Sequence, residues 1–181
     1  INTSSFPNTR NTISGNFILD QINNITAFYD DMEFIVCSPG KTINRVLENK
    51  KIKVYNFRYL LFKKFEVIGV ESITDLIKKS KLYYTILLFF TISQLLKLIT
   101  VVSKEKPDLI YAHWFTPQAI TSFIVSKIYK IPFKITIHSR DLKILDYKLG
   151  KLGRRISNLI LKSSSGVTVT SKNILRTVKS V

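Results

Sequence analysis

Short apolar runs alternate with longer amphipathic stretches along this chain of 181 residues. The short runs are rich in β-branched and aromatic residues, and several have no polar face. This pattern is typical of strands in a parallel sheet that is covered on both sides. The predicted strands are FIVCS (34–38), IKVYNF (52–57), DLIYAH (108–113), FKITIH (133–138) and GVTVTS (166–171). The opening residues INTSS are expected to be the end of a preceding strand.

Helical patterns fill the intervals between these strands. They cover 15–29, about 73–103, 117–130, 142–163 and the residues from 171 onward. Ser14 and Ser171 are placed to cap helices, and Thr116 and Pro117 fit an N-cap and a first helical position. The segment 58–72 predicts a loop with a short strand. Such alternation predicts βαβ units with right-handed crossovers, and therefore an α/β fold: a doubly wound, Rossmann-like parallel sheet with helices on both faces.

The most apolar stretch is LYYTILLFFTISQLLKLITVV, residues 82–102. It is long enough to span a bilayer, which takes roughly 20 residues. Lys97 lies near its middle, however, where a lysine costs about 2.5–3.5 kcal/mol on insertion scales. We therefore expect a buried or half-buried helix under the sheet. A helix lying on a membrane surface is the second interpretation, because Lys78, Lys79 and Lys81 precede it.

The formal net charge is +16, from 28 Lys and Arg against 12 Asp and Glu. Such an excess concentrates anionic partners, although solvated surface lysines explain it equally well. We expect no nucleic-acid partner, because the lysines are scattered and no ribonucleoprotein, zinc-finger or basic-zipper pattern accompanies them. The one cysteine, Cys37, ends an apolar run, which predicts a buried residue rather than a nucleophile.

The loop before the first helix offers a first candidate ligand site. In open α/β sheets, ligands bind outside the carboxyl ends of the strands. The polar loop TSSFPNTRNTISGN leads from the first strand into a helix N-terminus. There the backbone N–H groups of Ser14, Gly15 and Asn16 are expected to be free for an anion, and Gly15 to allow a close approach. A capped helix after a loop is the simpler interpretation.

Two later strand ends carry the other candidates. His113 and Trp114 end one strand, where Trp114 offers an aromatic face to a sugar or packs in the core, and His113 orients the loop. His138, Arg140 and Asp141 end the next, where a histidine can hold a hydroxyl or phosphate oxygen, an arginine a phosphate, and an aspartate a hydroxyl. No metal site is expected, because the two histidines are far apart in sequence and no carboxylate cluster accompanies them.

These motifs, taken in order, resemble those of family 4 glycosyltransferases. PDLIYAHWFTPQAITSFIVSKIYKIPFKITIHSRDL resembles the family's central signature, in which one strand ends in A-H and the next in H-G-x-D. SSFPNTRNTISGNFILDQI is similar to its first loop and helix, and SGVTVTSKNILRTV to its closing strand and helix. The resemblance implies a GT-B enzyme with two Rossmann-like domains. Residues 1–181 would be its acceptor-side N-terminal domain, truncated at both ends, without the donor-binding C-terminal domain.

The resemblance also implies roles for single residues. His138 matches the family histidine that contacts the transferred sugar and is the expected catalytic residue. Gly15 matches a glycine near the donor diphosphate, and Asp141 matches an acidic position near the acceptor. Substrate-binding roles are expected for Gly15, Asn16, His113, Trp114, Arg140 and Asp141. Ser139 departs from the family pattern, which has glycine there, and narrows the approach to His138.

The implied function is acceptor binding in a retaining nucleotide-sugar glycosyltransferase of the hexosyl-transfer type, in surface polysaccharide or glycolipid synthesis. The expected partners are a glycan or lipid-linked acceptor, the nucleotide-sugar and, peripherally, an anionic membrane. No metal or other cofactor is expected, the fragment alone should be inactive, and the location should be cytoplasmic, at the inner face of the membrane. The alternative is a non-enzymatic basic module that binds anionic membranes through 78–104.

Overall fold

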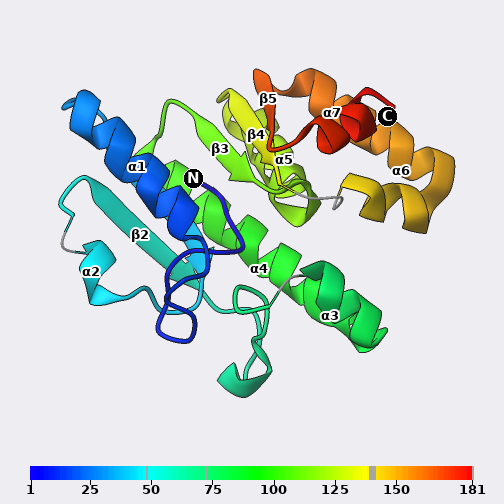
Figure 1. The fold of residues 1–181 in the computed structure, drawn as a ribbon, viewed down its shortest axis with the longest axis horizontal. Helices are drawn as coiled ribbons and strands as arrows, with labels where there is room; N and C mark the ends of the chain where they lie inside the picture. The colour runs from blue at the N-terminus through cyan, green and yellow to red at the C-terminus, as the bar shows by residue number, and fades with distance from the viewer. Residues whose placement is uncertain (48, 72, 139–141, 181) are drawn as a thin grey trace. The chain divides into compact units, whose positions relative to one another are not determined.

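The computed structural model describes residues 1–47, 49–71, 73–138 and 142–180. The chain forms two compact units. Unit 1 contains Ile1 and Thr3–Val101, and unit 2 contains Asn2 and the residues from Val102 onward. Each unit has its own parallel sheet, with strands β1 and β2 in unit 1 and strands β3, β4 and β5 in unit 2 (Figure 1).

The sheet of unit 1 pairs β1 (Phe34–Pro39) with β2 (Ile52–Phe57). The opening residues, predicted to end a strand, form no strand element, but they pair with β1: Cys37 N donates to Ile1 O at 2.8 Å and Thr3 N donates to Cys37 O at 3.1 Å. The predicted burial of Cys37 is confirmed, and burial raises the pKa of its thiol to about 12. Cys37 is therefore a packed thiol rather than a reactive thiolate.

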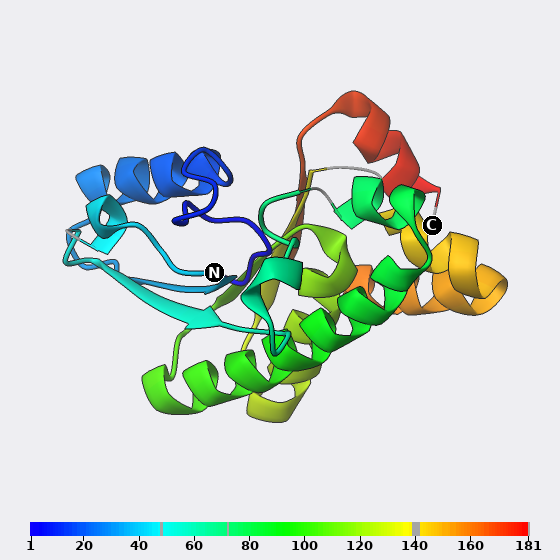
Figure 2. The ribbon, with the colours of Figure 1, turned by 90° about the horizontal axis from the view of Figure 1, so that it is seen from below.

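Helices cover both faces of this sheet, since α1 (Asn16–Phe28) lies over one face and α4 (Leu82–Glu105) over the other (Figure 2). The stripe Ile18, Leu19 and Ile22 is buried on α1. On α4, Phe90 is fully buried, and its ring centroid lies 5.3 Å from that of Phe57 on β2. Shorter elements complete the unit: α2 (Asn44–Leu47), the 3-10 helix η1 (Lys63–Phe65) and α3 (Ile73–Lys79).

Unit 2 repeats strand and helix in the order that a βαβ unit requires. Its parallel sheet has the order β3 (Ile110–His113), β4 (Phe133–Ile137), β5 (Gly166–Val169). The strands are followed by α5 (Ile120–Tyr129), α6 (Lys143–Ser163) and α7 (Lys172–Lys179). Ala112, Phe133, Ile135 and Ile137 are buried in the sheet. The predicted fold class is confirmed: an α/β fold of parallel sheets flanked by helices, as in a Rossmann-like domain.

Two predicted helix starts are wrong. The cap of α1 is Gly15, without a side-chain bond, because Ser14 Oγ contacts Ser5 Oγ instead. Helix α5 begins at Ile120 rather than Pro117, after the π-helical turn η2 (Phe115–Ala119), in which Thr116 has extended angles.

Of the other predicted boundaries, some are wrong and one is confirmed. The predicted helix 73–103 is two helices, which separate at Ser80 and Lys81. No strand forms among the described residues of 58–72. The cap at Ser171 is confirmed, since its Oγ accepts from Ile174 N at 3.3 Å.

Helix α4 is half-buried, as predicted. Among the described helices it alone is long and apolar enough to cross a membrane, and 33% of its most apolar stretch is buried. One face, with Phe90, Gln94 and Leu98, is buried. Lys97 lies with its Nζ 5.5 Å from the Tyr55 ring centroid. The other face exposes Leu82, Leu88, Phe89, Ile92 and Leu96.

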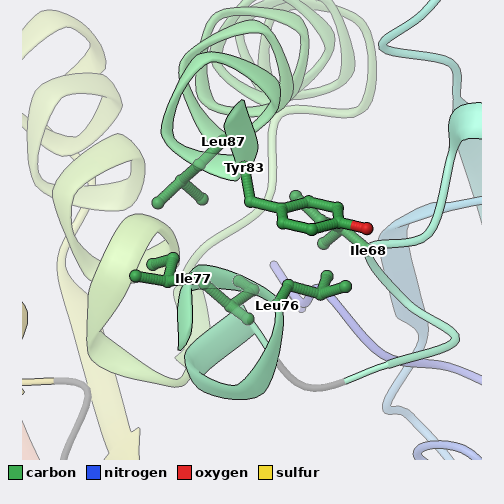
Figure 3. A pocket seen from close by; sticks show the side chains of 6 residues that line it. Ile68, Leu76, Ile77, Tyr83 and Leu87 are labelled. Atoms are coloured by element: carbon green, nitrogen blue, oxygen red, sulfur yellow. The ribbon is translucent and has the colours of Figure 1, made fainter. Parts of the chain in front are cut away.

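A small apolar recess lies where α3 meets α4. It is lined by Ile68, Ile73, Leu76, Ile77, Tyr83 and Leu87. In Figure 3, Leu76 and Ile77 of α3 lie opposite Tyr83 and Leu87 of α4, and Ile68 lies on the same side as Tyr83. Ile68 and Leu76 are buried, so the segment before α3 packs against the two helices at this recess.

Candidate functional site

The two histidines of the chain meet at the carboxyl ends of β3 and β4. His113 ends β3 opposite Thr136 of β4, and His138 follows β4 directly. The Nδ1 atom of His113 lies 3.0 Å from Nε2 of His138, with ring centroids 5.2 Å apart and ring planes 19° apart. Their distance in sequence was therefore no argument against a shared site. Among the described residues, no third His, Cys, Asp or Glu joins them as a metal ligand.

Both imidazoles are neutral at neutral pH. Burial, with a smaller contribution from the neighbouring His138, lowers the pKa of His113 to about 3. Burial alone lowers the pKa of His138 to about 4. A hydrogen bond between two neutral rings needs one donor and one acceptor nitrogen, so each ring constrains the tautomer of the other. The pair can therefore orient a ligand by hydrogen bonds but does not present a cation to it.

Trp114 folds back over this pair. Its backbone adopts a φ of 74°, which is unusual for a bulky residue. Its N–H donates to Thr136 O at 2.9 Å, and its ring centroid lies 4.9 Å from that of His138. Trp114 is half-buried. The indole thus packs against His138, in line with the core interpretation of Trp114. Part of Trp114 stays exposed, in line with the sugar-binding interpretation.

Two residues that the sequence analysis did not single out complete the cluster. The ring of Tyr111 lies 4.6 Å from that of His113, centroid to centroid, and its hydroxyl is 2.5 Å from Thr136 Oγ1. Tyr111 precedes His113 by two positions, so both side chains lie on the same face of β3. That spacing was a signal that could have identified Tyr111.

The turn after Trp114 is fixed from within unit 2. The Asn2 amide nitrogen lies within hydrogen-bond distance of Gln118 O at 3.1 Å, Thr121 Oγ1 at 2.9 Å and Ser122 Oγ at 3.0 Å. Asn2 itself is fully buried. A buried amide with several partners holds a loop rigidly, and η2 leads directly from Trp114.

The local backbone of unit 1 requires a glycine at Gly15, independently of any ligand. It has a φ of 75°, and an added Cβ would lie 2.4 Å from Ser5 O and 2.8 Å from Phe6 Cα. The main chain at Ser5 and Phe6 therefore fills the space beside this glycine. Its predicted contact with a donor diphosphate stays a prediction.

The expectation of three free amides before α1 is wrong for two of them. Ser14 N donates to Asn11 Oδ1 at 2.9 Å, and Asn16 N donates to Ile13 O at 3.1 Å. The asparagine-rich loop caps itself before any ligand binds. The side chain of Asn16 is a better candidate, because its Oδ1 is buried without a hydrogen-bond partner among the described residues.

The predicted site residues fall into three groups. His113, Trp114 and His138 are brought together in unit 2, whereas Gly15 and Asn16 are adjacent in unit 1. Arg140 and Asp141, together with Ser139, lie outside the described residues. The assembled cluster is therefore the part of the predicted site to which geometry can be assigned.

The fold and this cluster define a Rossmann-like α/β protein with an aromatic and histidine site at its strand ends. The chain belongs to Glycosyltransferase Family 4, because the profile of that family matches residues 64–181, well over half of its length. No curated protein matches the chain. Family membership gives a GT-B domain with a glycosyltransferase-type role, which in general involves binding of a nucleotide-sugar and an acceptor.

Proposed function

We propose that residues 1–181 form the N-terminal, acceptor-side domain of a retaining glycosyltransferase that transfers a hexosyl group from a nucleotide-sugar. A second Rossmann-like domain would supply most donor contacts. The observation that supports this best is the cluster of His113, Trp114 and His138 at two neighbouring strand ends. The likeness of the chain to family 4 motifs favours a pathway that makes surface polysaccharide or glycolipid.

In this proposal the cluster positions the transferred sugar. His138 hydrogen-bonds a hydroxyl of that sugar as a neutral imidazole, and His113 fixes its tautomer. The exposed part of Trp114 packs against the apolar face of a sugar ring. Catalysis then comes from positioning and from fixed donors that stabilise the charge on the leaving diphosphate. The reaction as proposed uses no metal or other cofactor.

The remaining candidates take supporting roles in the same proposal. Arg140 binds phosphate with its guanidinium fork, and Asp141 accepts a hydrogen bond from an acceptor hydroxyl. Gly15 and Asn16 contribute to the donor side. The acceptor is a glycan or a lipid-linked sugar, and the enzyme works in the cytoplasm at the inner face of the membrane, in peripheral contact with anionic lipid.

The test is the variant His138→Ala in the full-length enzyme. We expect kcat to fall at least about tenfold, since the variant removes a sugar-contacting group. His138→Gln keeps a hydrogen-bonding group beside His113 and should recover part of the loss. Thermal unfolding of both variants separates a lost contact from a lost fold. Turnover of His138→Ala close to wild type would remove His138 from the site, and turnover by residues 1–181 alone would overturn the domain assignment.

A second candidate function is a membrane-binding module without enzyme activity. It is favoured by the exposed apolar face of α4, on which Leu82, Leu88 and Leu96 are 65%, 58% and 60% exposed. Lys78, Lys79 and Lys81 lie just before this face. A gene that continues into a second Rossmann-like domain with an E-x₇-E motif supports the enzyme. A stop codon shortly after Val181 would favour the module.

A further inference from the structure

The loop after β2 presents large apolar side chains to solvent at its tip. We call residues 58–65 the 58–65 tip, which Figure 1 draws in teal at the bottom of the picture. Leu61, Phe62 and Phe65 are 83%, 60% and 52% exposed. The rings of Phe62 and Phe65 are in edge contact, with centroids 6.4 Å apart. Exposed apolar side chains that gather in this way mark an interaction site more often than scattered ones do.

The base of this tip is firmly held. The buried carboxylate of Glu66 accepts hydrogen bonds from Tyr59 N at 2.9 Å and Leu60 N at 3.1 Å. The Tyr59 hydroxyl accepts from Ile68 N at 2.7 Å, and its ring packs edge-on against Phe90 with centroids 5.1 Å apart. The apolar residues are thus held outward by a network on the core rather than left outside by a loose loop.

The charge of the tip has one sign. Arg58, Lys63 and Lys64 are cationic, and the sequence RYLLFKKF contains no acid. Lys64 Nζ lies 5.0 Å from the centroid of the Phe65 ring. The adjacent acid, Glu66, is 7% exposed and is turned into the base. A ligand that meets the tip therefore meets apolar side chains and positive charge together.

We propose that the 58–65 tip inserts into the interfacial region of an anionic membrane. Aromatic and leucine side chains partition to the headgroup level, and neighbouring Lys and Arg are attracted to anionic lipids. A protein partner fits less well, because a stable protein interface needs about 800 Å² from each partner. A tip of eight residues offers a small convex surface, which a soft lipid phase can surround.

The position of the tip links it to the proposed function, on which this step rests. It follows the carboxyl end of β2, the edge at which open α/β sheets bind ligands. The first loop reaches the same segment, since the Arg10 guanidinium donates to Glu66 O. Insertion of the tip would bring this edge of unit 1 to the lipid surface, where a lipid-linked acceptor presents its sugar.

Vesicle flotation of the full-length protein tests the inference. The vesicles contain phosphatidylcholine alone, or phosphatidylcholine mixed with phosphatidylglycerol. We expect flotation with the mixed vesicles and its release by high salt. Phe62→Ser/Phe65→Ser should weaken it at least tenfold, and Lys63→Gln/Lys64→Gln should weaken it for mixed vesicles. The matched control, Leu88→Ser/Phe89→Ser, removes similarly exposed side chains from α4 and should float as wild type does.

Two results would overturn the inference: wild-type protein that floats with neither lipid, or a tip variant that floats as well as wild type. A loss confined to the α4 variant would place the contact on that helix instead. Turnover of a nucleotide-sugar is read separately. A protein that turns over the donor but does not float refutes the tip and keeps the enzyme, whereas one that floats through the tip without turnover refutes the enzyme.

Discussion

His113 Nδ1 lies 3.0 Å from His138 Nε2, although 25 positions separate the two residues in the chain. Neighbouring parallel strands end at the same edge of a sheet, so the topology brings the rings together. Only one of the two facing nitrogens can carry the shared proton while both rings are neutral. The orientation and tautomer of His138 therefore depend on His113, which makes His113 a positioning residue.

This dependence predicts the effect of removing His113 from the full-length enzyme. His113→Ala should lower kcat by roughly tenfold, with a smaller change in KM, because His138 loses the partner that orients it in the transition state. His113→Gln should restore part of kcat, since its amide can still bond His138. Steady-state kinetics of both variants provides the test. Equal defects in the two variants, matched by equal losses of thermal stability, would indicate a packing role instead.

The same pair predicts a pH dependence of stability. In the unfolded chain each histidine binds a proton near pH 6.5, whereas the folded pKa values are about 3 and about 4. Well above pH 6.5 both states are neutral and the pair contributes no pH dependence. Below it the unfolded state binds more protons, so stability falls as the pH is lowered toward about 4.

Urea unfolding at about pH 7 and about pH 5 measures this effect. The double variant His113→Gln/His138→Gln cannot titrate in this window and should lose less stability than wild type over the same interval. Carboxylates contribute equally to both proteins, so the difference isolates the histidines. An identical pH dependence in the two proteins would contradict the lowered pKa values.

The strands were predictable because local composition fixes them. Val36 and Ile135 are β-branched residues in short runs that favour strands, and both are buried in the sheets. The errors lie at helix ends, where the hydrogen bonds of single side chains decide. Serine is a residue type that caps helices well, but the hydroxyl of Ser14 contacts Ser5 Oγ instead of a backbone amide of α1. The break between α3 and α4 has no Gly or Pro. Its signal was Ser80, whose Oγ accepts from Leu82 N at 3.3 Å.

The candidate site was predictable residue by residue but not as an assembly. The strand ends predicted His113, Trp114 and His138, whereas the contact between the histidines follows from the order of the strands in the sheet. The prediction of free backbone amides at Ser14 and Asn16 is wrong because both amides donate to acceptors within the loop itself. These acceptors belong to Asn11 and Ile13. Local hydrogen bonds of this kind compete with any ligand, and spacing alone does not reveal them.

Gly15 should tolerate no side chain. Gly15→Ala combines a positive φ with a Cβ at 2.4 Å from Ser5 O, so we expect a loss of more than about 2 kcal/mol. Gly40→Ala is the control, because Gly40 has a φ of 79° but its nearest neighbour would be 3.6 Å from the new Cβ. The control should cost about 1 kcal/mol. Equal losses in thermal or urea unfolding would refute the close approach of Ser5.

Glu66 should control the order of the 58–65 tip independently of any membrane. Its carboxylate accepts from Tyr59 N and Leu60 N, and Arg58 Nε lies 3.6 Å from the same oxygen. Glu66→Ala leaves two amides without their acceptor, at a cost of about 1–3 kcal/mol, whereas Glu66→Gln keeps an acceptor oxygen.

Amide hydrogen exchange of the full-length protein measures the order of the 58–65 tip directly. Exchange at Tyr59 and Leu60 should accelerate at least tenfold in Glu66→Ala and much less in Glu66→Gln, with β1 unaffected as an internal reference. If both variants exchange as wild type does, the carboxylate does not hold the base. If β1 also exchanges faster, the substitution has loosened the unit as a whole. Faster exchange at Tyr59 and Leu60 alone would show that Glu66 keeps Leu61 and Phe62 facing outward. The two hydrogen bonds from backbone amides to the Glu66 carboxylate fix the backbone that carries these side chains.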